Sequence, residues 1–378
     1  MREVPMKKVL VVGGAGYVGC VLVEELLAKG YSVRVLDRLF FGRDALGSSL
    51  DRVELLTEDM RELDPSHFEG CGAVINLGGL SNDPTAEFDP RANEELNTDA
   101  AIRVAEMARQ ADVERLVFAS SASIYDQGVG QEAEDVLMDE EYPVDPKAAY
   151  ATSKLAAERR ILPLAGPEFA PVAFRMGTVF GFSPRMRYDL VVNTFVKDAL
   201  SEGRIHVFYG GSMWRPLIDV KDAARAYVNA LACDPQLVRG QVFNLAAGNF
   251  RVSELALRAQ RTLQKLGVPV ELDIDYSYRL VRSYRITSQR AQRMLGFSPR
   301  VTVEESIEHM VAEIRRHGYT DFSHPRYYNI EWMKVLEEAA QIVSRHGYVL
   351  SQLVEAPEPA RQPGVVSRIS SARTGRAG

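Results

Sequence analysis

The sequence predicts an α/β protein built on a doubly wound parallel sheet, with a smaller α/β part interleaved with it. Two observations lead to this fold class. Short apolar runs alternate with amphipathic helical stretches along the first half of the chain, which is the pattern of parallel strands joined by crossover helices. After about residue 179 this alternation loosens, yet the apolar stretch "GQVFNLAAG" (240–248) is expected to return to the main sheet.

The elements of the first half follow one another as strand, helix, strand. The expected strands are 8–12, 32–37, 52–60, 71–80 and 115–125, and the expected helices are 17–28 and 97–111. Ligands of a doubly wound sheet bind beyond the carboxyl ends of its strands. The stretches "NLGGL" (76–80) and "SSAS" (120–123) fall at such ends and are therefore candidate site segments.

The glycines that follow the first strand are spaced G-x-x-G-x-x-G, at Gly13, Gly16 and Gly19. A turn of this kind lets backbone N–H groups and a helix N-terminus approach a pyrophosphate. Asp37 closes the second strand, where a carboxylate can accept hydrogen bonds from both ribose hydroxyls and would repel a 2′-phosphate. The unit therefore predicts dinucleotide binding with NAD favoured over NADP, although the neighbouring Arg38 leaves a phosphate-accepting alternative open.

A tyrosine and a lysine stand four residues apart in the helix-forming stretch "AAYATSKLAAE" (148–158). Positions i and i+4 of a helix share one face, so Tyr150 and Lys154 can reach one small volume. An unperturbed phenol has a pKa near 10, too high for an efficient base at neutral pH, and a nearby ammonium lowers that value. The pair therefore indicates a tyrosine meant to lose its proton, against the alternative of an ordinary surface pair.

Composition limits the classes of function. The 378 residues carry a formal net charge of −6 and 46% hydrophobic residues, which indicates a globular protein and argues against a general nucleic-acid or anionic-membrane binder. No apolar run reaches about 18 residues, and the first residues do not read as a signal peptide. Three separated cysteines and six histidines without ligand spacing suggest neither a disulfide framework nor a metal, so we expect a cytoplasmic protein without a metal.

The second half of the chain contains fewer strands. We expect a helix at 189–203, a strand at 204–211, a helix at 220–232 that begins near Asp219 or Asp222, and an amphipathic helix at 330–345 that covers the core or an oligomer interface. The last segment, 351–378, is rich in Pro, Ser, Ala and Gly and has no periodicity. That composition predicts disorder after about residue 352.

Together, "GGAGYVG", "NLGGL", "SSASIY", "YATSK", "RMGTVFG", "WRPLIDVKD", "FNLAAG" and "RMLGFSP" resemble, in order, the extended short-chain dehydrogenase/reductase superfamily, particularly its nucleotide-sugar epimerase/dehydratase branch. The resemblance covers roughly residues 7–316. It implies a Rossmann domain at 1–178 with a return segment at about 216–247, and a substrate-binding part at 179–215 and 248–350. It also implies bound NAD, a nucleotide-sugar substrate, and a homodimer paired through helices around 92–110 and 150–163.

The resemblance assigns a role to each matching residue. It implies three catalytic residues, Ser121, Tyr150 and Lys154. Its cofactor-binding positions are Gly13, Gly16, Tyr17, Val18, Asp37, Asp59, Met60, Leu77, Gly78, Gly79, Asn97 and Lys154, with Asp59 at the adenine. Its substrate positions, together with the arginines of the insert "SPRMRYDLVVN", are Ser123, Asn193, Arg185, Arg187, Arg215 and Arg282.

The implied reaction is an epimerisation. Tyr150 takes the proton of a sugar hydroxyl while a hydride leaves the same carbon for NAD, Ser121 hydrogen-bonds that oxygen, and Lys154 also holds the nicotinamide ribose. The ketone is planar, so a rotated sugar accepts the hydride on its other face. Inversion at C4 of a UDP-hexose is the leading prediction. The alternatives are a 4,6-dehydratase, a ketoreductase or an NAD-binding scaffold without turnover.

Departures from the family pattern guide this choice. Ala122 and Ser123 stand where 4,6-dehydratases carry an acidic pair, and Ser123 also replaces the cysteine of GDP-mannose 3,5-epimerases. Both reactions are therefore ranked below C4 epimerisation. Thr178 and Asp126 replace a frequent asparagine and glycine, and leave the substrate open.

Three local features carry two interpretations each. Arg185 and Arg187 either bind a phosphate or carboxylate or belong to a solvated basic loop. The acidic segment 132–142 is either a solvated loop, which is the expectation, or a binding patch. Trp214 either stacks on a ligand or packs in the protein.

Overall fold

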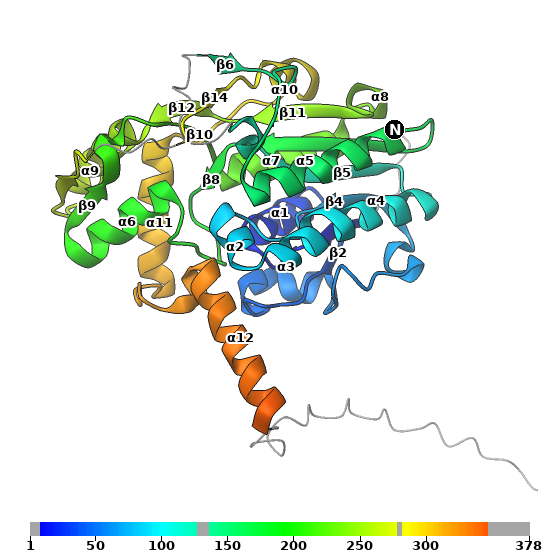
Figure 1. Ribbon diagram of the computed structural model, residues 1–378, viewed down its shortest axis with the longest axis horizontal. Coiled ribbons are helices and arrows are strands. Elements are labelled where there is room, and N and C mark those ends of the chain that lie inside the picture. The colour runs from blue at the N-terminus through cyan, green and yellow to red at the C-terminus, as the bar shows by residue number, and fades with distance from the viewer. Residues whose placement is uncertain (1–7, 127–135, 278–281, 347–378) are drawn as a thin grey trace, which may run out of the picture. The chain divides into compact units, whose positions relative to one another are not determined.

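The computed structural model describes residues 8–126, 136–277 and 282–346 (Figure 1). The tail for which disorder was predicted lies outside these residues. The chain divides after Trp332 into two units, and each is described by itself. The first unit holds the sheets and the candidate site. The second begins at Met333 and contributes the remainder of helix α12 (Asn329–His346), which confirms the helix predicted at 330–345.

The centre of the first unit is a seven-stranded sheet in the order β11-β7-β5-β4-β1-β2-β3, with every neighbouring pair parallel. Its strands are β1 (Lys8–Val12), β2 (Ser32–Leu36), β3 (Glu54–Leu56), β4 (Cys71–Asn76), β5 (Arg115–Ser121), β7 (Ala170–Met176) and β11 (Gln241–Leu245). The strand order changes direction between β1 and β4, so the chain leaves these strands on opposite sides. The doubly wound parallel sheet is confirmed, and β11 joins it as expected.

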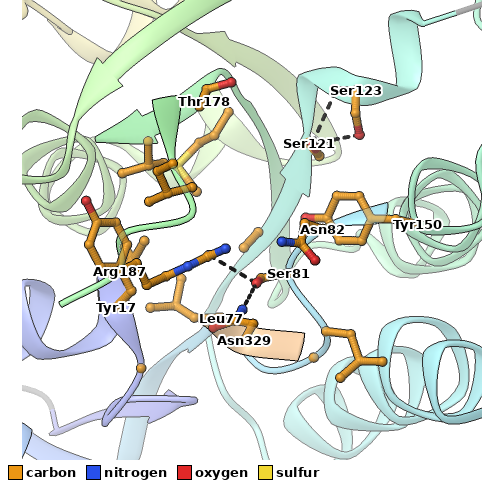
Figure 2. Close-up of a pocket in the computed structure, with 18 of the residues that line it drawn as sticks. Tyr17, Leu77, Ser81, Asn82, Ser121, Ser123, Tyr150, Thr178, Arg187 and Asn329 are labelled. Atoms are coloured by element: carbon orange, nitrogen blue, oxygen red, sulfur yellow. Dashed lines mark hydrogen bonds between the residues drawn. The ribbon is translucent and has the colours of Figure 1, made fainter. Parts of the chain in front are cut away.

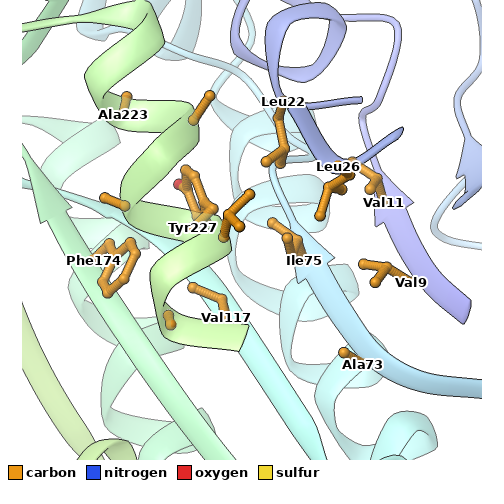
Figure 3. Packing of buried hydrophobic residues seen from close by; sticks show 14 of the residues in the cluster. Val9, Val11, Leu22, Leu26, Ala73, Ile75, Val117, Phe174, Ala223 and Tyr227 are labelled. Carbon is orange, nitrogen blue, oxygen red and sulfur yellow. The ribbon is translucent and has the colours of Figure 1, made fainter. Parts of the chain in front are cut away.

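Helices cover both faces of this sheet (Figure 1). Alternate residues of a strand point to opposite faces. On one face Val9 and Val11 of β1 share a core with helices α1 (Tyr17–Ala28) and α7 (Val220–Ala232), which Figure 3 shows. On the other, Leu10 and Val12 share a core with α4 (Ala101–Gln110) and α5 (Ala149–Ile161). The sheet is therefore buried on both sides, which explains its continuous apolar strands.

A second hydrophobic core lies among smaller sheets and helices. One sheet has three strands: β8 (Thr178–Phe180), β10 (Trp214–Asp219) and β12 (Gly248–Arg251). The second pairs β9 (Arg204–Val207) with β13 (Glu271–Ile274), and the third pairs β6 (Leu137–Met138) with β14 (Arg285–Ile286). Helices α6 (Val191–Glu202), α9 (Val252–Lys265) and α11 (Val303–His317) supply most of the core. The short helices are α2 (Asp83–Phe88), α3 (Pro90–Glu94), α8 (Pro235–Val238), α10 (Gln289–Leu295), the π-helical η3 (Glu95–Ala100), and the 3₁₀ turns η1 (Asp44–Arg52), η2 (Pro65–Phe68), η4 (Ala122–Tyr125), η5 (Leu162–Leu164), η6 (Phe208–Gly211) and η7 (Pro325–Tyr327).

Several element ends differ from the prediction. The strand expected to run to Gly211 ends at Val207, because Tyr209 and Gly210 adopt positive φ angles of 56° and 65° that no strand tolerates. The strand expected to reach Tyr125 ends at Ser121, whose side chain caps η4. Helix α7 begins at Val220, and Asp219 is its N-cap, whose carboxylate accepts a hydrogen bond from Lys221 N at 2.7 Å. The expected start near this residue is confirmed.

Burial corrects one expectation about charge. Within the described part of the acidic segment, Glu140 is only 9% exposed, and its carboxylate accepts a hydrogen bond from Asn244 N at 2.8 Å. This residue therefore belongs to the packed protein and not to a solvated loop. None of the described helices is both long enough and apolar enough to cross a bilayer.

Candidate active site

A pocket opens at the carboxyl ends of β1, β4, β5 and β7, with a volume of about 340 Å³ (Figure 2). It brings together many of the predicted site residues: Gly13, Gly16, Tyr17, Val18, Leu77, Gly79, Ser121, Ser123, Tyr150, Lys154, Arg185, Arg187, Arg215 and Arg282. The remaining ones, Asp37, Asp59, Met60, Gly78, Asn97 and Asn193, lie outside its lining.

The glycine turn forms one end of the pocket. Gly13 follows β1 with a positive φ of 77°, and a Cβ there would lie 3.0 Å from Gly78 N and from the carbonyl carbon of Leu77. A Cβ on Gly19 would overlap the backbone of the turn itself. Side chains are therefore excluded where the loops after β1 and β4 meet. Only bare backbone at this switch point leaves room for a pyrophosphate over the first turn of α1.

Asp37 lies beside this turn. Its carboxylate accepts hydrogen bonds from Ala15 N at 2.9 Å and from Leu39 N at 2.7 Å, and burial raises its pKa. These two bonds fix the carboxylate and leave each oxygen with further acceptor capacity. Glycine turn, helix N-terminus and fixed acceptor together are the groups that a dinucleotide requires, so the residues present fit an NAD-type cofactor.

Arg38, which could have favoured a 2′-phosphate, is ion-paired. Its Nη1 lies 2.8 Å from Asp59 Oδ2, and Arg61 Nη2 lies 2.7 Å from the same oxygen. Asp59 is thus surrounded by two guanidiniums outside the pocket lining. Met60 is buried behind Gly78, where a Cβ would contact its sulfur.

The three predicted catalytic side chains meet at the other end of the pocket. Ser121 Oγ accepts from Ser123 N at 3.2 Å and lies 2.9 Å from Ser123 Oγ (Figure 2). Tyr150 lies in the first turn of α5, one turn before Lys154, whose Nζ lies 5.9 Å from the centroid of the phenol ring. The helical spacing predicted from the sequence therefore does bring phenol and ammonium to one place.

Burial dominates the proton affinities of this pair. It raises the pKa of Tyr150 to about 12, and the hydrogen bond with the Ser121 side chain only partly opposes that rise. Burial likewise lowers the pKa of Lys154 to about 8, since the residue is 4% exposed. No carboxylate is ion-paired with Lys154 in the described part of the chain. The lowered phenol pKa that the sequence suggested is thus not produced by the protein atoms alone.

Two buried asparagines support the pocket from behind. Asn97 donates to Leu80 O at 3.1 Å and to Asn93 Oδ1 at 2.7 Å, and its own Oδ1 occupies the space that a Cβ on Gly79 would need. Asn193 accepts from Gly181 N at 2.9 Å and donates to Tyr17 Oη at 3.1 Å and Arg187 O at 2.9 Å. Both are fully buried, and Asn97 Oδ1 has no hydrogen-bond partner among the described residues.

The arginines of the insert are not solvated. Arg185 and Arg187 are 4% and 5% exposed, so the interpretation of this loop as a solvated basic loop is wrong. Arg187 is paired with Asp189 at 2.8 Å and donates to Ser81 Oγ at 3.1 Å. Arg185 stacks on Phe41 at 3.5 Å, and its Nη2 donates to Asn329 Oδ1 at 2.5 Å.

Arg185 carries an unbalanced positive charge in the pocket wall. Its Nε and Nη1 are buried and have no hydrogen-bond partner among the described residues. Burial lowers its pKa to about 9, and the charge of Arg187 acts in the same direction. An anion near these two donors would accept their hydrogen bonds and would raise the pKa of Arg185 again.

Arg215 and Arg282 lie side by side in the wall near Tyr284. Arg282 Nη1 donates to Asp83 Oδ2 at 2.5 Å, and its Nε lies 3.2 Å from Asp126 Oδ2. Arg215 Nη1 donates to the carbonyls of Trp214, at 2.9 Å, and of Arg282. Trp214 itself is stacked by the guanidiniums of Arg251 and Arg285, at 4.9 Å and 5.0 Å, and does not line the pocket, so the packing interpretation holds.

Some lining residues were missed by sequence reasoning: Phe41, Ser81, Asn82, Asp83, Tyr284 and Asn329. The signal for Ser81 to Asp83 was present, because they directly follow "NLGGL" beyond the end of β4. Asn329 had none: it donates to Ser81 Oγ at 2.6 Å from 248 residues away in the chain (Figure 2). No group of three or more His, Cys, Asp or Glu placed to hold a metal ion occurs in the described ranges.

The chain is similar in sequence and fold to several known proteins. The UDP-glucose 4-epimerase of Mycolicibacterium smegmatis is 29% identical over 326 residues, covering 82% of this chain and 98% of that protein. The UDP-glucuronic acid decarboxylase 1 of Xenopus tropicalis is 26% identical, over 84% of this chain and 74% of that protein. Among solved structures, MoeE5 in complex with UDP-glucuronic acid and NAD is 28% identical with a TM-score of 0.69, covering 82% of this chain and 99% of MoeE5.

A protein-family match adds to these pairwise similarities. Residues 9–246, which span the parallel sheet from β1 to β11 with its glycine turn and catalytic candidates, match the NAD dependent epimerase/dehydratase family. The chain therefore belongs to the NAD dependent epimerase/dehydratase family.

Proposed function

We propose that this protein is an NAD-dependent nucleotide-sugar epimerase that inverts C4 of a UDP-hexose. The observation that carries the proposal is the meeting of Ser121, Tyr150 and Lys154 in one pocket with the glycine turn. The relative that is 29% identical is a UDP-glucose 4-epimerase, which supports the proposed substrate class. In this proposal residues 1–178 with 216–247 form the cofactor domain, and 179–215 with 248–350 form the substrate-binding part.

Bound NAD supplies a reversible hydride acceptor for the sugar carbon. The protein side of the reaction is a proton transfer: the phenolate of Tyr150 takes the proton of the sugar C4 hydroxyl as that carbon becomes a ketone, and later returns it. Ser121 donates a hydrogen bond to the same oxygen and holds it beside the phenol. Since the ketone is planar, a sugar that rotates in the pocket presents its other face and recovers hydrogen with inverted configuration.

The wide gap between the pKa values of Tyr150 and Lys154 has a role in this mechanism. At neutral pH Lys154 is charged and Tyr150 is protonated, because their pKa values are about 8 and about 12. A further positive charge in the pocket lowers the phenol pKa, since opposite charge favours phenolate. The base is therefore expected to become active only when the oxidised, positively charged nicotinamide is bound.

In this proposal different arginines bind the diphosphates of the cofactor and of the nucleotide sugar. Arg185 was predicted from the sequence to bind the substrate, but because of its two unpartnered donors we assign it here to the diphosphate of the cofactor. Arg215 forms no ion pair with a described carboxylate and is assigned, with Arg282, to the diphosphate of the nucleotide sugar. Dimerisation through the helices around 92–110 and 150–163 stays a prediction.

The test is incubation of the protein with UDP-, dTDP-, GDP- and CDP-sugars in deuterated water, followed by proton NMR and mass spectrometry. We expect an isobaric C4 epimer without deuterium, because the same hydride returns. Loss of 18 mass units would establish a dehydratase, and deuterium gain would establish an enolising epimerase; either result would overturn C4 epimerisation. Net NADH consumption would establish a ketoreductase, and retained NAD with no sugar converted would favour a scaffold.

A further inference from the structure

The acid in the pocket wall is not one that the sequence motifs pointed to. Asp83 begins α2, directly after the loop that follows β4, and α2 packs against α5, the helix that carries Tyr150. Asp83 is 8% exposed and lines the pocket. Among the described residues it is the one carboxylate in that lining.

The two oxygens of Asp83 have different environments. Oδ2 accepts the hydrogen bond from Arg282 Nη1 at 2.5 Å, which fixes the carboxylate in place. Oδ1 is buried and has no hydrogen-bond partner among the described groups. A buried acceptor without a donor is costly, so a bound ligand is expected to bring the donor.

No guanidinium of the described pocket wall donates a hydrogen bond to Asp83 Oδ1. Arg282 is shared by two carboxylates, because its Nε also lies 3.2 Å from Asp126 Oδ2. Arg215 lies in the same wall, but its Nη1 donates to the backbone carbonyls of Trp214 and Arg282. Arg187, also in the lining, is paired with Asp189 at 2.8 Å.

Building on the proposed function, we propose that Asp83 Oδ1 accepts a hydrogen bond from a hydroxyl of the bound sugar and thereby selects neutral hexoses over hexuronates. A hydroxyl has a proton to donate to this oxygen. The carboxylate of a hexuronate has none at neutral pH, and beside Asp83 Oδ1 it would place a second negative charge next to the first, where like charges repel. Asp83 is in this sense a specificity residue and not the base of the reaction.

The experiment uses the full chain carrying Tyr150→Phe, loaded with NAD, so that a sugar binds without turnover. Calorimetric titration with UDP-glucose and UDP-glucuronate gives the ratio of their dissociation constants. We expect at least about 100-fold preference for UDP-glucose. Adding Asp83→Asn, which keeps an acceptor oxygen and removes the charge, should reduce the preference to about tenfold or less, mainly through tighter UDP-glucuronate binding.

Asp126→Asn is the matched control. It removes a carboxylate from the same guanidinium, but Asp126 does not line the pocket, so the preference should stay as it is in the parent. Asp83→Ser, which also keeps an acceptor, replaces Asp83→Asn if the latter does not fold. An unchanged preference in a folded Asp83 variant, or an equal loss in Asp126→Asn, would overturn the inference alone. Binding of neither sugar would overturn the proposed function and the inference with it.

Discussion

The glycine turn after β1 and the catalytic candidates on β5 and α5 form opposite ends of one pocket and depend on different physics. The turn requires glycine because there is no room for side chains: a Cβ at Gly13 would lie 3.0 Å from the backbone of the loop after β4. The Ser121, Tyr150 and Lys154 end works by burying side chains whose proton affinities then shift. We therefore expect the glycine turn to be sensitive to added side-chain volume, and the catalytic end of the pocket to be sensitive to a change of charge.

The largest expected effect separates chemistry from cofactor binding. Tyr150→Phe removes the proposed base and leaves the glycine turn untouched, so we expect turnover to fall by about 10³- to 10⁴-fold with bound NAD retained. Initial rates and the NAD content of the purified variant measure the two effects. Tyr276→Phe, at a tyrosine that is 79% exposed, is the control. Loss of NAD in proportion to activity would show that the two ends are not separable.

The next effect concerns the stability of the NAD-free protein. Burial lowers the pKa of Lys154 from 10.5 to about 8, which at about 1.4 kcal/mol per factor of ten corresponds to roughly 3 kcal/mol lost from the unfolding free energy at pH 7. As pH rises from 8 to about 10, the folded state releases this proton before the unfolded state does, so the unfolding free energy should rise.

Lys154→Met should therefore abolish turnover yet stabilise the NAD-free protein by about 3 kcal/mol at pH 7. The difference from the parent should shrink as pH approaches 10. Chemical denaturation at several pH values measures it, and Lys147→Met, at an exposed lysine, gives the effect of losing a surface ammonium. A variant no more stable than the parent at pH 7 would contradict the buried ammonium.

The smallest expected effect tests added volume. Gly13→Ala forces a side chain onto a positive φ of 77° and against the backbone of Leu77 and Gly78. We expect a loss of about 2 kcal/mol in unfolding free energy and the disappearance of bound NAD. Gly70→Ala is a matched control, because its φ is 72° but nothing lies within 4 Å of the new Cβ. If both variants lose NAD equally, the close approach of the two loops is not what matters.

The comparison also explains which parts of the site could be predicted. Gly13, Gly16 and Asp37 belong to one βαβ unit, and Tyr150 and Lys154 to one helix turn. Local spacing fixes the relative positions of such residues, so motif spacing could predict them, and the resemblance to a known family assigned their roles. The pKa of Tyr150 could not be obtained in this way, because burial depends on everything that packs around the ring.

The sequence by itself determined the parallel sheet, the glycine turn at its switch point and the helical pairing of Tyr150 with Lys154, since each depends on contacts within a few dozen residues. Only the tertiary structure decided that Arg185 is buried under Asn329, and that Arg282 lies between Asp83 and Asp126. These contacts join segments up to about 200 residues apart. Long-range charge pairing depends on where whole elements pack, and no local pattern encodes that.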